Sequence, residues 1–247
     1  MDLVIQLYVY TMNTNQEGEK TRQEEINECL FRNMKNPVFS TIHILLENPS
    51  DLDYYTELID PIKEKTKCKF TIHGEQPCYS DLVWYISANI EDNKTVCIMN
   101  SDIFMGHTTI EFIEKELDYN TVISLTRHEF TSEGHPVCNV STCILIYRYC
   151  GSHDAFIFKT PITESFNYYY VNIPQNVNGA EAVFMRAWVD AGKKLKNLCF
   201  DIPIYHMHKN KFYIKSYETI ANHTLCNIKP SVPNDRPDIQ SQMIELF

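Results

Sequence analysis

The chain has 247 residues, of which 44% are hydrophobic and 22% are charged, and its formal net charge is −10. This length suits one large domain or two small ones, and the composition is ordinary for a soluble globular protein. The acidic balance argues against a general nucleic-acid binder, because phosphate backbones are held by clustered Lys and Arg. It is compatible with an anionic small ligand, since one helix N-terminus or local basic patch can hold such a ligand.

The sequence contains no transmembrane pattern, because no apolar run approaches the ~20 residues that a membrane-spanning helix needs. The apolar start "DLVIQLYVY" lacks the basic n-region and cleavage pattern of a signal peptide, so we expect a cytoplasmic protein. Nine cysteines are scattered along the chain without a CxxC pair. In a reducing compartment this pattern indicates free, mostly buried thiols rather than disulfides.

Short apolar runs alternate with helical patterns over the first 130 residues. The apolar runs are rich in β-branched and aromatic residues, which predicts strands at 3–10, 41–48, 68–74, 95–100 and 121–130. Helices are predicted between these strands at 51–66, where Pro61 interrupts the pattern, and at 79–90. Two more helices are predicted to begin at Thr21 and at Thr108. Each of these threonines is followed three residues later by a glutamate, as in a capping box.

This alternation requires crossover connections, which indicates a largely parallel sheet with helices on both faces. In such sheets ligands bind beyond the carboxyl ends of the strands. Asp102 follows the fourth predicted strand, directly after Asn100 and Ser101. We therefore expect the Asp102 carboxylate at the ligand-binding edge of the sheet.

The pattern becomes less regular after residue 130. Short strands are predicted at 143–149 and 153–159, followed by an aromatic, Asn-rich loop over 166–179. A helix begins at Ala180 and is ended by Gly192. The last predicted strand covers 198–209, and its proline, Pro203, predicts an edge strand or a bulge.

Two groups of side chains have the chemistry of a metal site. A carboxylate after a buried strand, as at Asp102, can hold a hard divalent cation; the structural alternative is a turn residue or a cap for the next helix. His206 and His208 lie two residues apart in a predicted strand, so their imidazoles share a face. Such a pair can bind a transition metal or contact a phosphate, or it can simply occupy an exposed strand edge.

Other charged residues are candidates for catalysis or for binding an anion. Glu181 stands at the start of a helix, where the helix N-terminus stabilises a carboxylate; the functional alternative is a general base with a raised pKa. Asp154 is either a turn carboxylate or part of a site. Arg127 and Lys159 are the nearest basic residues and could face a diphosphate, although each residue type is more often a solvated charge.

Together, "MNSDIF", "VISLTR", "SHDAFIFK", a G-x-E helix start and "IPIYHMHKN" resemble, in this order, a family of GT-A-type glycosyltransferases found in bacteria and in large DNA viruses. The resemblance covers residues 95–213 and rests on the order and spacing of these motifs. It implies an α/β, Rossmann-like fold with a mostly parallel central sheet flanked by helices and a smaller antiparallel acceptor-side portion. It also implies one domain over 1–221, with a nucleotide-binding half (1–104) and an acceptor and metal half (105–221), and a C-terminal tail (222–247).

The resemblance further implies a nucleotide-sugar donor, a UDP-sugar above all, a glycan or protein-linked acceptor, and Mn²⁺ or Mg²⁺. In the family an Asp-x-Asp motif binds the metal and the donor; Asp102 matches its second acid, whereas Asn100 replaces the first. A C-terminal histidine completes the metal site, which points to His206 or, preferentially, His208. The family's binding residues map here onto Asn100, Ser101 and Asp102 for the diphosphate and onto Tyr8, Tyr10, Thr11 and Asp81 for the nucleoside.

The same resemblance implies roles in catalysis. Glu181 takes the place of the family's catalytic base, although members often have Asp-Asn where this chain has Glu181-Ala182. Asp154 and Arg127 match positions that face the donor or acceptor sugar. Three alternatives compete with this interpretation: a nucleotidyltransferase, which the single glycine of residues 11–22 disfavours, a metal hydrolase, and a non-catalytic sugar- or nucleotide-binding member of the same fold.

Overall fold

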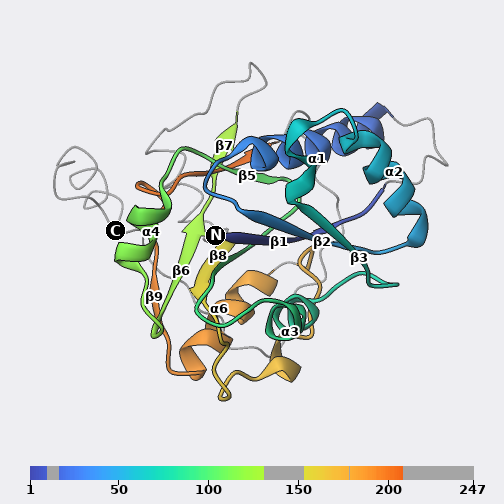
Figure 1. The fold of residues 1–247 in the computed structure, drawn as a ribbon. Helices are drawn as coiled ribbons and strands as arrows, with labels where there is room; N and C mark the ends of the chain where they lie inside the picture. The colour runs from blue at the N-terminus through green and yellow to red at the C-terminus, as the bar shows by residue number, and fades with distance from the viewer. Residues whose placement is uncertain (10–16, 131–152, 178, 208–247) are drawn as a thin grey trace.

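A seven-stranded sheet forms the centre of the computed structural model, which describes residues 1–9, 17–130, 153–177 and 179–207 (Figure 1). The strand order is β3-β2-β1-β4-β8-β6-β9. Its strands are β1 (Asp2–Leu7), β2 (Thr41–Leu46), β3 (Cys68–Ile72), β4 (Thr95–Met99), β6 (Thr121–Thr126), β8 (His153–Lys159) and β9 (Lys194–Lys196). Only β8 among them runs antiparallel, to β4 and to β6, so the predicted mostly parallel sheet is confirmed.

Helices cover both faces of this sheet (Figure 1). They are α1 (Glu17–Lys35), α2 (Pro49–Ile59), α3 (Tyr79–Asn89), α4 (Ile110–Glu116) and α6 (Ala180–Asp190), with 3₁₀ turns η1 (Lys63–Lys67) and η2 (Tyr168–Val171). Helices α1 and α2 pack on one face and α3 and α6 on the other, each with its own hydrophobic core. No helix among the described residues is both long enough and apolar enough to cross a membrane.

Helical spacing of apolar residues determines which face each helix buries. In α1, Ile26, Leu30 and Met34 are fully or almost fully buried, as their four-residue spacing predicts. In α6, Phe184 and Trp188 are buried in the same way. Burying a side chain of this size contributes about 1.5–3 kcal/mol, so these stripes fix the position of both helices against the sheet.

A second, three-stranded sheet packs beside the first. It consists of β5 (Ile103–Met105), β10 (Ile204–Met207) and β7 (His128–Phe130), with β10 in the middle. Strand β10 is antiparallel to β5 and parallel to β7. The prediction of an edge strand or a bulge at Pro203 is therefore wrong: Pro203 precedes the first paired residue, so its missing N–H is not needed in the ladder.

Several predicted boundaries need correction. Helix α1 begins at Glu17 rather than at Thr21, and α4 is capped by Thr109, whose Oγ1 accepts a hydrogen bond from Phe112 N at 3.2 Å, rather than by Thr108. The predicted strand 121–130 divides into β6 and β7, which belong to different sheets. The run from 143 to 149 lies outside the described residues, and β5 and β9 were not predicted.

The cysteines of the described segments behave largely as expected. Cys29, Cys97 and Cys199 are buried free thiols, and Cys68 and Cys78 are free and partly buried. Burial raises the pKa of the Cys68 and Cys78 thiols to about 11, which keeps them protonated near neutral pH. These thiols therefore pack as small apolar side chains.

We expect Gly106→Ala to destabilise the protein. An added Cβ at Gly106 would lie 2.6 Å from Cε2 of Tyr205 and 3.1 Å from the carbonyl oxygen of Pro203. The Tyr205 ring cannot move away freely, because it packs against Phe104 at 5.3 Å and His128 at 5.8 Å between ring centroids. Overpacking of this kind costs about 1–3 kcal/mol, which should lower the melting temperature by several degrees in circular dichroism.

Gly192→Asn is the matched control for Gly106→Ala. Gly192 has φ +83° with no atom within 4 Å of an added Cβ, and asparagine tolerates this left-handed conformation. Its melting temperature should stay close to that of the parent. Equal melting temperatures for Gly106→Ala and the parent would show that the contact with Tyr205 is not a constraint.

Candidate functional site

Several predicted site residues meet at one edge of the seven-stranded sheet. Strands β1, β4 and β6 all end there, and β8 begins there because it runs antiparallel to β4 and β6. In the register of the sheet, Met99 at the end of β4 pairs with Ala155, and Thr126 at the end of β6 pairs with His153. The topology therefore brings the residues after β4, after β6 and at the start of β8 to a common edge.

Asp102 and His206 are in direct contact. Asp102 follows β4 in a tight turn, and its backbone oxygen accepts a hydrogen bond from Met207 N at 3.0 Å. Strand β10 places His206 opposite Ile103, so that His206 Nε2 lies 2.9 Å from Asp102 Oδ2. A carboxylate oxygen and an imidazole nitrogen are therefore in contact at the carboxyl end of β4.

Arg22, which was not among the predicted site residues, completes this contact. Its Nη2 lies 2.5 Å from Asp102 Oδ2, the oxygen that His206 also contacts, and its Nη1 lies 3.1 Å from Glu25 Oε2. The sequence signal for Arg22 is its position four residues before Ile26, on the buried stripe of α1, where an arginine needs a partner.

The charges around Asp102 favour its ionised form. Burial alone would raise the pKa of Asp102, but the positive charge of Arg22 and the contact with His206 outweigh burial and hold that pKa well below its usual range. Tyr8, which follows β1, is close enough to Arg22 to interact with it electrostatically. The site therefore places the ionised carboxylate of Asp102 beside the positively charged guanidinium of Arg22.

Asp154 is the centre of a second group at the same edge. It is the second residue of β8, not a turn residue before the strand, and its side chain is buried. Asn100 Nδ2 donates to Asp154 Oδ1 at 2.8 Å, and Arg127 Nη1 lies 3.4 Å from Asp154 Oδ2. An aspartate at position 100 would set two carboxylates at this distance, so the amide of Asn100 avoids repulsion and adds a hydrogen bond.

Glu181 lies in the first turn of α6, two residues after Gly179, whose φ of 89° starts the helix. Burial, and next the negative charge of Asp154, raise the pKa of Glu181 to about 8, whereas Arg127 opposes the shift. A carboxyl group with such a pKa can accept a proton more readily than an ordinary glutamate. The role of Glu181 as a general base stays a prediction.

Asp81 and Lys159 lie apart from these groups. Asp81 Oδ2 accepts a hydrogen bond from Cys78 N at 2.7 Å and lies 3.5 Å from His73 Nε2, just beyond β3. Strands β2 and β1 lie between β3 and β4 in the sheet, so the ends of β3 and β4 are three strand spacings apart, about 14 Å. Lys159 pairs with Thr95 at the opposite edge of the sheet and is not part of the site.

Three predicted residues, Tyr10, Thr11 and His208, lie outside the described residues. Within the described part of the chain, no group of three or more His, Cys, Asp or Glu side chains has the arrangement of a metal site. A metal ion would therefore take two protein ligands from this part, Asp102 and His206. Mg²⁺ and Mn²⁺ sites at phosphates commonly use one or two protein ligands, with substrate oxygens and water supplying the rest.

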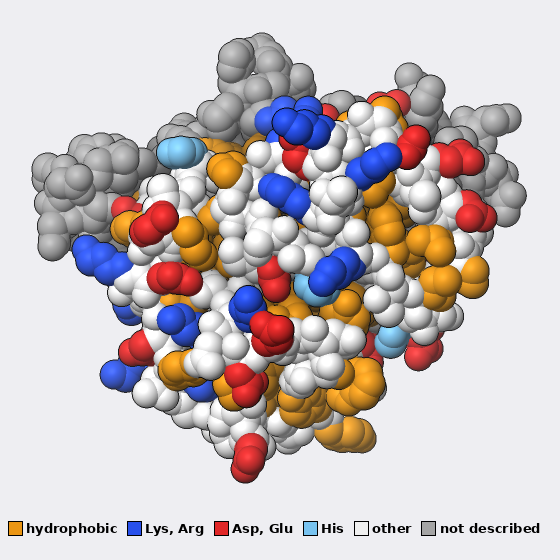
Figure 2. All heavy atoms as spheres, in the orientation of Figure 1, with side chains coloured by type: hydrophobic (Ala, Val, Ile, Leu, Met, Phe, Trp, Pro, Cys, Tyr) orange, Lys and Arg blue, Asp and Glu red, His pale blue; other side chains and the backbone are white. Residues whose placement is uncertain are grey.

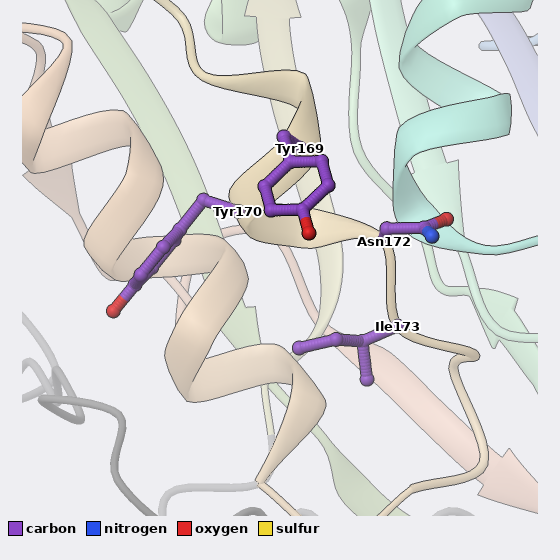
Figure 3. Close-up of a pocket in the computed structure, with 4 residues that line it drawn as sticks. All are labelled: Tyr169, Tyr170, Asn172 and Ile173. Atoms are coloured by element: carbon purple, nitrogen blue, oxygen red, sulfur yellow. The ribbon is translucent and has the colours of Figure 1, made fainter.

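A surface cavity of about 240 Å³ lies on the α3 and α6 side of the molecule, lined by Tyr169, Tyr170, Asn172 and Ile173 (Figure 3). Asn172 points toward α3, where its Oδ1 accepts a hydrogen bond from Ser80 Oγ at 3.0 Å (Figure 3). Tyr169 is 90% exposed. Acidic and basic side chains are interspersed over the face of the molecule in Figure 2.

No protein-family model matches the chain, and no curated protein matches it. Solved structures do. The chain is similar to GalNAc-T7 with UDP, GalNAc and Mn²⁺, at TM-score 0.55 and 8% identity, over 90% of this chain and 46% of that one. It is also similar to S. aureus TarS 1-349 in complex with UDP, at TM-score 0.52 and 12% identity, over 84% and 60%.

A third similar structure is the mannosyltransferase PcManGT from Pyrobaculum calidifontis in complex with GDP-Man and Mn²⁺, at TM-score 0.51 and 8% identity, over 84% of this chain and 56% of that one. The chain thus spans about half to three fifths of the length of these proteins. At such identities the likeness concerns the fold. The predicted fold class is confirmed: the chain has the GT-A-type fold of these glycosyltransferases.

We expect Glu181→Gln to change how stability depends on pH. The pKa of Glu181 in the fold, about 8, lies above its ordinary value of 4.5, so folding favours the protonated group. This contribution is present below about pH 4.5 and is lost as the pH rises toward about 8. The melting temperature of the parent should therefore fall relative to that of Glu181→Gln, by a few degrees, between about pH 5 and about pH 9.

Glu111→Gln provides the control, because Glu111 is exposed in the first turn of α4. Its difference in melting temperature from the parent should not change with pH. A Glu181→Gln variant whose difference from the parent is equally constant would contradict the raised pKa of Glu181.

Proposed function

We propose that the protein is a metal-dependent glycosyltransferase that transfers a sugar from a nucleotide-sugar donor, a UDP-sugar above all, to a glycan or protein-linked acceptor. The observation that carries this proposal is the contact between Asp102 and His206 at the carboxyl end of β4. It stands on a GT-A-type sheet, with Asp154 and a Glu181 of raised pKa at the same edge.

The residues at Asp102 fit a divalent cation such as Mn²⁺ or Mg²⁺. A carboxylate oxygen and an imidazole nitrogen 2.9 Å apart can approach one ion, and the low pKa of Asp102 keeps the carboxylate ready to bind. Such an ion neutralises the negative charge that develops on a diphosphate leaving group. His208, which lies outside the described residues, is a second proposed ligand.

Other residues along this edge of the sheet would bind the nucleoside and the diphosphate of the donor. Tyr8, Tyr10 and Thr11, after β1, and Asp81, after β3, would contact the nucleoside. Asn100 and Ser101 would lie against the diphosphate beside Asp102.

Glu181 and Asp154 would act on the sugars. Glu181 would accept the proton of the acceptor hydroxyl as that oxygen bonds to the sugar carbon and the diphosphate departs. Asp154, held by Asn100 and Arg127, would orient the sugar by accepting hydrogen bonds from its hydroxyls. Its ion pair with Arg127 limits the negative charge that would otherwise raise the pKa of Glu181 further.

We expect Asp102→Asn to abolish metal-dependent donor binding. Isothermal titration of the parent with UDP- and GDP-sugars should give affinity that requires Mn²⁺ and disappears with EDTA. Because the variant lacks the carboxylate charge, its affinity in Mn²⁺ should fall at least tenfold, to the level of the parent in EDTA. Donor hydrolysis and transfer should be lost with it.

Asp60→Asn is the control, since Asp60 is an exposed residue beyond α2 that pairs with Lys65. It should bind the donor as the parent does. Parent affinity that is unaffected by EDTA would contradict a metal-dependent donor site. Binding without any turnover of the donor would favour the non-catalytic member of this fold.

We expect Arg22→Gln to tighten the binding of Mn²⁺ alone. Arg22 Nη2 and a cation would compete for Asp102 Oδ2, and an ion pair in a partly exposed setting is worth about 1 kcal/mol. Removing it should lower the Mn²⁺ dissociation constant about threefold to tenfold in titrations without nucleotide. Arg32→Gln, on the same helix but paired with Glu28, should leave that constant unchanged; weaker Mn²⁺ binding by Arg22→Gln would contradict the competition.

A further inference from the structure

Four buried polar atoms border the candidate site without a hydrogen-bond partner among the described residues. They are Tyr79 Oη, both amide atoms of Gln175, and Asn100 Oδ1. The side chains of Tyr79 and Gln175 belong to residues that are only 1% and 6% exposed. Buried polar groups are nearly always paired in folded proteins, so a cluster of unpaired ones beside a candidate active site calls for a ligand.

Backbone contacts bring Gln175 to the start of α3. Tyr79 N donates to the carbonyl oxygen of Ile173 at 3.0 Å, and Cys78 forms an antiparallel bridge with Pro174. Gln175 follows directly after this bridge. It lies near enough to the Tyr79 hydroxyl to affect its pKa, although the two groups do not meet in hydrogen-bonding geometry.

The Tyr79 ring connects this pair to Glu181. It stacks on Phe184 with ring centroids 4.3 Å apart and planes inclined by 14°. Phe184 lies one helical turn after Glu181 on α6, so Tyr79 packs along the face of α6 that carries the carboxyl group. Burial and then the charges of Glu181 and Asp154 raise the pKa of Tyr79 well above its ordinary value, which keeps the hydroxyl protonated.

Asn100 extends the group on the side of the sheet. Its Nδ2 is used by Asp154 Oδ1 at 2.8 Å, which leaves Oδ1 of the same amide buried and unpaired. Gln175, Tyr79, Asp154 and Asn100 therefore form a series of polar side chains, of which Tyr79 and Asp154 interact electrostatically with Glu181. They come from three elements, α3, β8 and the end of β4, and from the segment that precedes α6.

We propose that Gln175, Tyr79 and Asn100 form a subsite for sugar hydroxyl groups, in which the Gln175 amide binds two neighbouring hydroxyls of a pyranose ring. The inference rests on the proposed function and adds residues to it. A primary amide presents a donor and an acceptor side by side, which matches a vicinal diol whose one hydroxyl accepts and whose other donates. The Tyr79 hydroxyl and Asn100 Oδ1 supply a further donor and a further acceptor.

The chemistry of these groups selects against other ligands. An apolar group would leave all four atoms unpaired and buried, and such unpaired atoms make binding unfavourable. A phosphate placed among these groups would meet the negative charge of the Asp154 carboxylate, which repels it. A neutral polyol can satisfy all four atoms at once.

Stability provides the first arm of the test. Gln175→Met replaces the amide by an apolar group of similar size, and the folded protein without ligand loses no protein hydrogen bond among the described residues. Its melting temperature should equal or exceed that of the parent by a few degrees. Gln23→Met is the matched control: Gln23 is equally buried, but its Nε2 donates to Asn27 Oδ1 at 2.9 Å and to Tyr55 Oη at 3.2 Å, so this variant should melt below the parent.

Binding provides the second arm. The parent, Gln175→Met and Tyr79→Phe are titrated with UDP and with three sugar nucleotides: UDP-glucose, UDP-galactose and UDP-N-acetylglucosamine. Comparing the affinities distinguishes the contribution of the nucleotide from that of the sugar. The affinity for UDP should not change, whereas affinity for the sugar nucleotide that the parent prefers, or the KM for its acceptor, should worsen at least tenfold in Gln175→Met. Tyr79→Phe should show a smaller loss of the same kind.

Three results would overturn the subsite. The first is a Gln175→Met variant that melts below the parent as Gln23→Met does, because Gln175 would then have a structural partner. The second is an equal loss of UDP and UDP-sugar affinity, and the third is unchanged affinity and KM. If the parent binds no nucleotide, the proposed function fails, and thermal shifts with methyl pyranosides at tens of millimolar decide the subsite alone: a shift that Gln175→Met abolishes supports it, and no shift overturns it.

Discussion

The arrangement of the site depends on the antiparallel insertion of β8 between β4 and β6. In an all-parallel sheet the first residues of every strand lie at the edge opposite the ligand. Because β8 runs the other way, its second residue, Asp154, stands beside the residues that follow β4 and β6. Asn100 and Arg127 can then hold one buried carboxylate between two strands, and Glu181 acquires a neighbour whose negative charge raises its pKa.

At this edge each buried aspartate has its own positively charged or hydrogen-bonding partners. Asp102 faces Arg22 and His206, and Asp154 faces Arg127 and Asn100. Breaking either pair would leave a buried charge without compensation, which is far more costly than removing both partners. Glu181 is the carboxyl group for which this balance is incomplete, and so it binds a proton near neutral pH whereas Asp102 stays ionised. Two carboxyl groups at one edge thereby acquire different pKa values from their surroundings alone.

Periodicity predicts the strands of the seven-stranded sheet other than β9, and it predicts the main helices. The predicted strands at 41–48, 68–74 and 95–100 match β2, β3 and β4 to within two residues, and Asp102 was placed correctly beyond β4. The division of 121–130 into β6 and β7 was missed, because both halves are apolar and only their partners in different sheets separate them. Arg22 was missed for a related reason: its position on the buried stripe of α1 indicates that it needs a partner, but that partner, Asp102, is 80 positions away in the sequence. The hydrogen bond between Asn100 and Asp154 likewise depends on the register of β4 against β8, which the sequence alone does not give.

The three-stranded sheet has a consequence for how the protein is made. Its strands come from residues 103–105, 128–130 and 204–207, and β10, which carries His206, is both the last of the described strands in the chain and the central one of that sheet. A growing polypeptide can pair β1, β2, β3 and β4 soon after they leave the ribosome, but it cannot position His206 until some hundred residues more have been synthesised. The imidazole contact with Asp102 is therefore among the last parts of the molecule to form, and a chain that stops short of β10 would retain much of its large sheet while lacking His206 beside Asp102.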